Sequence, residues 1–248
     1  MKLITLNTWA GREKEPFDKF IKDHRDFTDI FCFQEIFNDL DEEYSIDEKG
    51  RNRHILKEIT EILVDFNVYF CPVIENVYGI AIFLKKGMEV VASGEIMLYE
   101  NPSYEPEGEN GDHNRKMQWV HIKKDRKDFI VMNVHGHWNP KGKLDTENTI
   151  EQSKAIVEFI EKTGNIPKIL VGDFNLLPET QSIKMLEQNF TNLITKYNIL
   201  TTRTELYKGN DKHADYAFVS SEILVEGFKA LPDVVSDHAP LELQFDVF

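Results

Sequence analysis

Polar side chains able to bind a ligand stand directly after several apolar runs in this sequence. The clearest case is Lys168-Ile-Leu-Val-Gly-Asp-Phe-Asn175, where Asp173 and Asn175 follow the apolar run 169–171. Residues two apart on an extended backbone point the same way, so this carboxylate and this carboxamide are predicted to face one space. Pro178 then blocks further strand pairing. Alone, the stretch fits a ligand site at a strand end and a plain polar turn equally well.

The same pattern recurs, and six unrelated polar strand ends are a poor explanation for it. Three more apolar runs end at Asn7, Glu35 and His135. Near the carboxyl end, Asp215 opens an apolar run and Asp237-His238 precede the last one. An antiparallel strand that begins with Asp215 presents its carboxylate at the edge where parallel neighbours end. We therefore expect three Asp, one Glu, two Asn and two His to converge on one cleft.

The oxygen-rich side chains indicate a hard divalent cation. Carboxylate and carboxamide oxygens suit Mg²⁺ or Mn²⁺ better than a metal that prefers thiolate. Clustered carboxylates repel one another unless a cation lies between them. Such a cation polarises a phosphoryl oxygen, while histidines supply hydrogen bonds or protons. His135-Gly-His137 offers an alternative, a zinc site, although no helical His pair or Cys ligand follows it.

Strands outnumber helices among the elements that must position these groups. Apolar residues at helical spacing predict helices over about 15–27, 55–66, 150–160 and 181–188. Compact or alternating apolar runs predict strands over 3–6, 29–33, 68–73, 78–84, 88–91, 116–123, 128–134, 169–171, 214–219, 223–228 and 241–247. The turn at 85–87 predicts a hairpin between 78–84 and 88–91. No repeat or flexible linker divides the chain, so we expect a single domain over 1–248, with mixed sheets and outer helices.

Composition restricts the partners of the protein. The 248 residues carry a formal net charge of −14, which opposes tight, sequence-blind binding of nucleic acid unless bound cations offset the acids. Cys32 and Cys71 lie in apolar runs and predict reduced core thiols. No apolar run approaches the roughly 18 residues of a membrane-spanning helix, and no signal peptide begins the chain. We therefore expect a soluble, cytoplasmic protein without a membrane span, and favour a monomer.

Six short motifs together resemble the endonuclease/exonuclease/phosphatase superfamily, the DNase I-like metal-dependent phosphoesterases. They occur in the family's order: Leu6-Asn-Thr-Trp9, Phe33-Gln-Glu35, Asn133-Val-His135, Gly172-Asp-Phe-Asn175, Ala214-Asp-Tyr216 and Ser236-Asp-His238. The resemblance implies an α/β fold, a four-layer α/β sandwich with two mixed β-sheets packed face to face and helices outside. It also implies hydrolysis of a phosphodiester or phosphomonoester by in-line attack of water at phosphorus, with Mg²⁺ or Mn²⁺ as cofactor.

The resemblance also assigns roles at the metal. Glu35 is the expected principal ligand, and Asn7 and Asp237 are expected to help hold metal or phosphate. Trp9 departs from the family pattern, because many DNA-repair members carry Asp at this position. A second metal contact there is therefore in doubt, and Trp9 is instead a candidate substrate contact.

At the phosphate, the resemblance assigns five further residues. Asp173 is expected to orient and deprotonate the attacking water, and Asn175 to contact the phosphate. His238, oriented by Asp215, is expected to stabilise the charge on the pentacoordinate phosphorus, in the manner of a hydrolytic triad. His135 occupies a position that binds phosphate or acts as an acid.

For the residues that could contact the rest of the substrate, the sequence leaves alternatives open. His137 is either a substrate contact or a loop histidine packed beside Trp138. Arg115 and Arg203 either clamp a substrate phosphate or lie on the surface. The polar segment 101–114 is either a functional rim or a solvated loop. The candidate substrates are nucleic acid, a nucleotide, a sugar phosphate and a phospholipid head group. The alternative function is that of a non-catalytic relative, which binds a phosphorylated ligand and acts as an interaction module.

Overall fold

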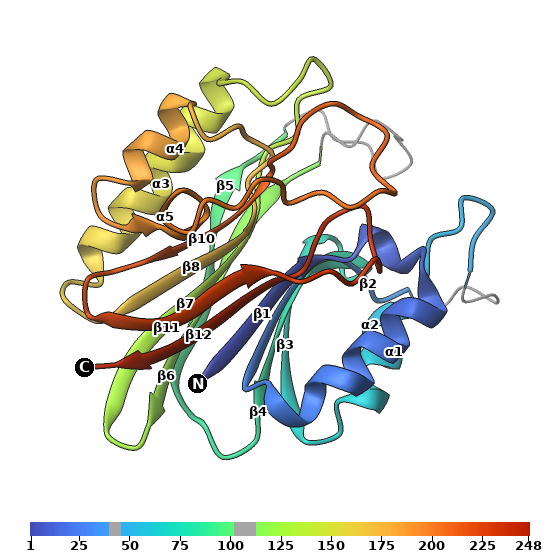
Figure 1. The fold of residues 1–248 in the computed structure, drawn as a ribbon, viewed down its shortest axis with the longest axis horizontal. Coiled ribbons are helices and arrows are strands. Elements are labelled where there is room, and N and C mark those ends of the chain that lie inside the picture. The colour runs from blue at the N-terminus through green and yellow to red at the C-terminus, as the bar shows by residue number, and fades with distance from the viewer. Residues whose placement is uncertain (40–45, 102–112) are drawn as a thin grey trace.

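Two six-stranded mixed sheets pack face to face, and helices cover their outer faces (Figure 1). This computed structural model describes residues 1–39, 46–101 and 113–248, so most of the segment 101–114 lies outside the described residues. The arrangement is the four-layer α/β sandwich expected from the sequence. In the described part of the chain, no helix is long and apolar enough to cross a membrane.

The two sheets differ in the order of their strands. The first sheet runs β11 (Ile223–Ala230), β12 (Leu241–Val247), β1 (Lys2–Asn7), β2 (Ile30–Phe37), β4 (Tyr78–Lys85) and β3 (Phe66–Ile74). The second runs β5 (Glu89–Tyr99), β6 (Arg115–Lys124), β7 (Lys127–His135), β8 (Lys168–Asp173), β10 (Asp215–Val219) and β9 (Thr191–Asn192). Most of these strands were predicted from the apolar runs, whereas the two-residue β9 was not.

Helices lie outside the sheets, near the strands that they follow in the chain. The first sheet carries α1 (Lys14–His24) and α2 (Ile55–Ile62), while α3 (Glu147–Lys162), α4 (Gln181–Leu186) and α5 (Leu193–Lys196) cover the second (Figure 1). Short 3₁₀ helices, η1 (Trp9–Gly11) and η2 (Arg25–Phe27), follow β1 and α1. The helix predicted over 55–66 is therefore too long, because its last residue, Phe66, already begins β3.

The alternation of side chains along a strand explains why the central strands are apolar throughout. In β1, Leu3 packs in the core between the sheets, whereas Ile4 packs in the core beneath α1 and α2. In β2, Cys32 faces the first of these cores and Phe31 the second. Successive residues of a strand point to opposite faces, so a strand covered on both faces needs an apolar residue at every position.

The predicted hairpin between 78–84 and 88–91 is wrong. Both edges of β4 are taken, by β2 and by β3, and β5 pairs instead with β6 in the other sheet. The turn at 85–87 therefore carries the chain from one sheet to the other. A turn sequence shows that the chain reverses, but it does not show which strand will supply the hydrogen bonds.

Strand pairing brings the polar strand ends together. His135 at the end of β7 lies opposite Asp173 at the end of the parallel strand β8. Asp215, the first residue of the antiparallel strand β10, lies on the other side of Asp173. In the first sheet, Asn7 pairs with Gln34 on the parallel strand β2. The geometry expected for Asp215 is therefore present, since an antiparallel strand begins where its parallel neighbours end.

Gly172 is required by the close approach of β7 to β8. Its φ angle is +131°, and a Cβ atom at this position would lie 2.1 Å from the carbonyl oxygen of Val134. The next residue is Asp173, so the position of this carboxylate depends on a backbone conformation that favours glycine.

We expect Gly172→Ala to lower the free energy of unfolding by about 2–4 kcal/mol, because backbone must shift to make room for the methyl group. Urea denaturation monitored by circular dichroism measures the change. Gly227→Ala is the matched control, since its nearest neighbour atom is 3.9 Å from the added Cβ. Equal stability of the Gly172 variant and the wild type would show that this strand contact imposes no constraint.

Candidate active site

The strand ends of both sheets open into one cleft with a volume of about 890 Å³. Nine of the twelve residues singled out from the sequence line it: Trp9, Glu35, Arg115, His135, Asp173, Asn175, Arg203, Asp237 and His238. Asn7 and Asp215 lie beneath its floor and contact lining residues, and His137 lies elsewhere. The cleft therefore joins residues that are more than 200 positions apart in the sequence.

Asn7 links the carboxylates of the two sheets. Its Nδ2 donates hydrogen bonds to Glu35 Oε1 (3.1 Å) and to Asp173 Oδ2 (3.0 Å). Its Oδ1 accepts a hydrogen bond from the backbone N–H of Trp9 (3.0 Å), which fixes the orientation of the amide. In this structure Asn7 turns its donor group to the two carboxylates and its oxygen to the backbone, and its expected part in holding metal or phosphate stays a prediction.

Glu35 reaches the cleft through an irregularity in β2. The strand does not end at Glu35, as the sequence indicated, but continues to Phe37, with a register shift between Phe33 and Ile36. Glu35 itself has a left-handed φ of 60°. A bulge of this kind re-aims a side chain, and here it sends a carboxylate from a strand interior into the cleft.

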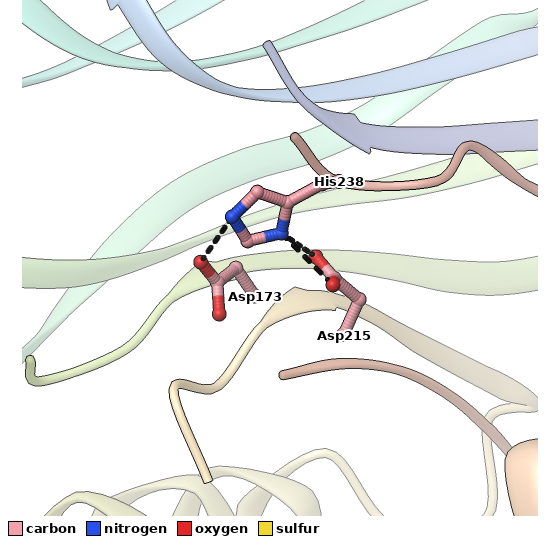
Figure 2. Close-up of side chains that lie close together, drawn as sticks. All are labelled: Asp173, Asp215 and His238. Carbon is pink, nitrogen blue, oxygen red and sulfur yellow. Dashed lines mark hydrogen bonds and ion pairs between the residues drawn. The ribbon is translucent and has the colours of Figure 1, made fainter. Parts of the chain in front are cut away.

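His238, Asp215 and Asp173 form a connected group (Figure 2). His238 Nδ1 lies 2.9 Å from both carboxylate oxygens of Asp215, and His238 Nε2 lies 3.7 Å from Asp173 Oδ2. Thr202 Oγ1 donates to Asp215 Oδ2 (2.9 Å) and so fixes this carboxylate from below. The family resemblance implied the pair Asp215–His238, but nothing in the sequence singles out the buried Thr202.

The loop that carries His238 is tied to the first sheet. Ser236 Oγ donates to the backbone carbonyl of Asn7 (2.7 Å) and accepts from the backbone N–H of His238 (3.1 Å). Asp237, between these two residues, lines the cleft. The last loop of the chain is therefore held against the first strand, and both sheets contribute to one site.

His135 lies between the two carboxylates, with Nε2 4.0 Å from Glu35 Oε1 and 4.0 Å from Asp173 Oδ2. Burial, together with the charge of Arg115, lowers the pKa of His135 well below its usual value. A further histidine, His113, packs beside it with ring centroids 6.2 Å apart. His113 was not predicted as a site residue, since it lies in the polar stretch that precedes β6.

The pKa values of Asp173 and Glu35 are shifted in opposite directions. Burial opposes ionisation of Asp173, but the charges of His238 and Lys143 outweigh it and hold the pKa of Asp173 well below its usual range. Burial raises the pKa of Glu35, and the nearby charges of Asp237 and Asp173 raise it further. The lowered pKa favours the carboxylate form of Asp173, and a cation beside Glu35 would lower the pKa of Glu35.

The pKa of His238 is shifted in the opposite direction to that of His135. Burial lowers its pKa, but the carboxylates of Asp215 and Asp173 outweigh burial, so the net effect is a raised pKa. Arg203 Nη1 contacts His238 Nε2 and lies 3.4 Å from Asp237 Oδ2. The imidazole is therefore held between two carboxylates and a guanidinium.

Asn175 does not continue the extended backbone assumed from the sequence, because its φ is 56°. Its backbone N–H donates to Asp173 Oδ1 (2.8 Å), so the two residues are joined directly. Lys143 Nζ donates to Asn175 Oδ1 (2.8 Å). Lys143 was not predicted, because a lysine in a polar loop rich in Pro and Gly is typical of an exposed side chain.

Arg115 and Arg203 both line the cleft and are not surface residues. Arg115 is 3% exposed, and the side chain of Arg203 is 6% exposed. Arg203 also packs its guanidinium 4.1 Å from the ring centroid of Tyr207. Two cations that the sequence left undecided are therefore buried in the wall of the cleft.

His137 is held by helix α3 and its N-terminal residues. Its backbone N–H donates to Gln152 Oε1 (2.8 Å), its Nε2 lies 3.2 Å from Asn148 Nδ2, and its ring packs on Tyr99. Trp138, which is 39% exposed, lines the cleft instead. His137 is therefore packed in its loop, but against Tyr99 and not beside Trp138 as one of the two interpretations expected.

The residues present fit a divalent cation, for two reasons. Asp173 and Asp215 add two buried carboxylates near those of Glu35 and Asp237, with ligand atoms within 4.8 Å of each other and of His238. Asp237 Oδ1 is buried and, within the described chain, has no hydrogen-bond partner. A buried carboxylate oxygen without a donor is costly unless a cation occupies the adjacent space. Among the described residues, the one group of three or more potential ligands with atoms this close includes neither His135 nor His137.

The fold and the cleft place the chain in the DNase I-like class of α/β proteins. The chain belongs to the endonuclease/exonuclease/phosphatase family, whose sequence profile matches residues 4–238. No relative is found among curated proteins. This membership confirms the family that the six motifs indicated.

Solved structures with a similar fold come from several organisms. An endonuclease/exonuclease/phosphatase from Bacteroides vulgatus is 18% identical, with a TM-score of 0.72 over 100% of this chain and 98% of the other. A mannosyl-6-phosphatase from Bacteroides thetaiotaomicron is 20% identical, with a TM-score of 0.74 over 99% of each chain. The human Nocturnin catalytic domain with bound sulfate is 16% identical, with a TM-score of 0.72 over 100% and 93%. At such identities the likeness concerns the fold alone.

We expect Asp215→Asn to lower the pKa of His238 by about 1 unit or more, because it removes the nearest negative charge. Titration of the imidazole by heteronuclear NMR, in metal-free buffer, measures the shift. Asp128→Asn, which changes a half-exposed surface carboxylate, should leave the His238 titration where it is in the wild type. An unchanged titration in Asp215→Asn would mean that Asp215 does not control the charge of His238.

Proposed function

We propose that this protein is a divalent-metal-dependent phosphoesterase that hydrolyses a phosphate ester by in-line attack of a water molecule activated by Asp173. The observation that carries this proposal is the position of Asp173, which joins both halves of the site. It accepts a hydrogen bond from Asn7 of the first sheet and lies 3.7 Å from His238. Family membership supports the same chemistry.

Asp173 is suited to act on the water. Its lowered pKa keeps it ionised, and the Asn175 backbone N–H and Asn7 Nδ2 each hold one of its oxygens. The water oxygen forms the new bond to phosphorus, its proton passes to Asp173, and the bond from phosphorus to the leaving oxygen breaks. The leaving oxygen then takes up a proton from solvent, so the products are phosphate, or a phosphomonoester, and an alcohol.

His238 and His135 serve different purposes on the phosphoryl group. His238, with its raised pKa and its Nδ1 on Asp215, is suited to stabilise the negative charge that builds up on phosphorus, together with Arg203, whose Nη1 contacts its Nε2. His135, with its lowered pKa, is a neutral imidazole and binds a phosphoryl oxygen through N–H rather than acting as the acid.

Glu35 and Asp237 are the residues proposed to hold Mg²⁺ or Mn²⁺, with Asn7 orienting Glu35. When bound, such a cation supplies Lewis-acid polarisation of the phosphoryl oxygens. The raised pKa of Glu35 and the unpartnered oxygen of Asp237 both favour a cation between them. Zinc is the competing identity, and metal analysis of the purified protein separates the two.

A small phosphorylated molecule fits the protein better than a nucleic acid. The net charge of −14 opposes a polyanion, and one relative of similar fold is a mannosyl-6-phosphatase. A phosphorylated sugar, a nucleotide and a lipid head group all have the required ester.

A cytoplasmic location of the protein stays a prediction.

We expect the wild type to release phosphate in the presence of Mg²⁺ or Mn²⁺, and Asp173→Asn to lose activity by about 10³-fold or more, because the base is removed while the shape of the side chain is kept. An activity panel of abasic DNA, single strands, nucleotides, sugar phosphates and phospholipids measures it. Asp128→Asn serves as the control.

Two outcomes would contradict the proposal. One is the absence of turnover by well-folded wild type with either metal on the whole panel. The other is full activity of Asp173→Asn. Binding of a phosphate ligand without metal and without turnover would instead support the non-catalytic alternative.

A further inference from the structure

Lys143 is a buried lysine of the cleft wall that contacts an amide and not a carboxylate. It lies in the loop between β7 and α3 and is 8% exposed. Its Nζ donates a hydrogen bond to Asn175 Oδ1 (2.8 Å), and it forms no ion pair with a carboxylate of the described residues. Burying an ammonium costs free energy that an exposed position would avoid. The bond to Asn175 is thus the feature that the burial of Lys143 must serve.

The loop that carries Lys143 is bound to the segment that carries Asn175. The backbone N–H of Leu177 donates to the carbonyl oxygen of Lys143 (3.0 Å). At the start of the same loop, the N–H of Gly136 donates to the carbonyl oxygen of Asp173 (2.7 Å). These bonds fix the loop on both sides of Asn175, so Lys143 and the carbonyl group of Gly136 have defined positions around its amide.

The amide of Asn175 lies between a donor and an acceptor. Its Oδ1 accepts from Lys143 Nζ, and its Nδ2 donates to the carbonyl oxygen of Gly136 (3.4 Å). An ammonium offers N–H donors alone, and a carbonyl oxygen can only accept. A half-turn of the amide would place N–H against N–H and oxygen against oxygen. The two partners therefore select a single orientation of a group whose two ends have nearly the same shape.

This orientation suits a phosphate contact. Asn175 lines the cleft although it is only 6% exposed. Terminal phosphoryl oxygens accept hydrogen bonds, so a carboxamide binds them through Nδ2 and not through Oδ1. In the described chain, Nδ2 makes one long hydrogen bond, to Gly136, and it carries two N–H groups. The second N–H remains for a ligand.

We propose that Lys143 is a positioning residue, which holds the Asn175 amide with Nδ2 available to a phosphoryl oxygen of the substrate. This inference rests on the proposed phosphoesterase function and on the phosphate contact expected of Asn175. Without the ammonium, the amide can turn over and present Oδ1 to the phosphate, an oxygen facing an oxygen. Lys143 acts in this account through Asn175 and does not itself need to touch the substrate.

A double-mutant cycle in kcat/KM tests the proposal, with Mg²⁺ and the faster substrate of 4-nitrophenyl phosphate and bis(4-nitrophenyl) phosphate. Asn175→Ala should lower kcat/KM by about 10- to 100-fold, the effect of losing a hydrogen bond to a charged group. Lys143→Met should lower it by about 5-fold or more, and Lys143→Arg, which keeps N–H donors, should lose less. Added to Asn175→Ala, Lys143→Met should cost less than about 2-fold, because the amide that it orients is already gone.

Lys141→Met is the matched control, because Lys141 lies in the same loop but is exposed. It should leave kcat/KM as in the wild type. A loss from Lys143→Met that is as large in the Asn175→Ala background as in the wild type would overturn the proposal. Lys143 would then act on the substrate independently of the amide, and the proposed phosphoesterase function would stay intact.

Spectroscopy provides a readout that needs no turnover. With Mg²⁺ present, inorganic phosphate should shift the side-chain Nδ2–H signals of Asn175 in heteronuclear NMR spectra of the wild type, where Asn175→Ala identifies these signals by their absence. Saturating phosphate should shift them much less in Lys143→Met, and circular dichroism confirms that the variant is folded. Equal shifts in the two proteins would contradict the proposal. If the shift depends on Lys143 but no ester is hydrolysed, the inference about Lys143 stands and the proposed hydrolysis fails.

Discussion

A buried pair of amides fixes the two sheets against each other, and the candidate site depends on it. Gln34 of β2 donates from Nε2 to Asn133 Oδ1 of β7 (2.7 Å), and Asn133 Nδ2 donates to the backbone carbonyls of Phe33 and Ala81 in the first sheet. Both side chains are fully buried. Apolar contacts between sheets are non-directional, whereas a misplaced buried amide leaves unsatisfied groups that cost about 1–3 kcal/mol each. Within the described residues, three of the four polar side-chain atoms of this pair find partners and Gln34 Oε1 does not, so the pair favours this relative position of the sheets through the bonds of Gln34 Nε2 and Asn133.

This position determines the geometry of the cleft. Glu35 follows Gln34 directly, and His135 stands two residues after Asn133. The 4.0 Å approach of His135 to Glu35 is thus set a few residues from the amide pair. Asn7 repeats the same arrangement at the cleft floor, because it bonds to one carboxylate from each sheet. The site combines groups at strand ends with groups from the connecting segments, among them Asn175, Lys143, Arg203 and the Asp237–His238 segment.

Much of the fold and of the polar centre could be predicted from the sequence, because strands buried on both faces are apolar until they end. At Asp173, which ends a strand, and at Asp215, which begins one, the sequence therefore shows both the boundary of the strand and the polar group that lies there. The bulge at Glu35 was not predictable in this way, since local sequence does not show that a strand resumes after a left-handed residue. Lys143 and His113 were missed for another reason. Their burial depends on contacts between distant segments, and their neighbours in the sequence are those of exposed loops.

The central claim is that water, activated within this cleft, attacks phosphorus. Hydrolysis of the preferred phosphate ester in water enriched in heavy oxygen tests it most directly, with mass spectrometry of both products. We predict that each turnover places one solvent oxygen in the released phosphate and none in the alcohol. Label in the alcohol, or phosphate free of label, would contradict the account, because the bond broken or the nucleophile would then differ from the one proposed.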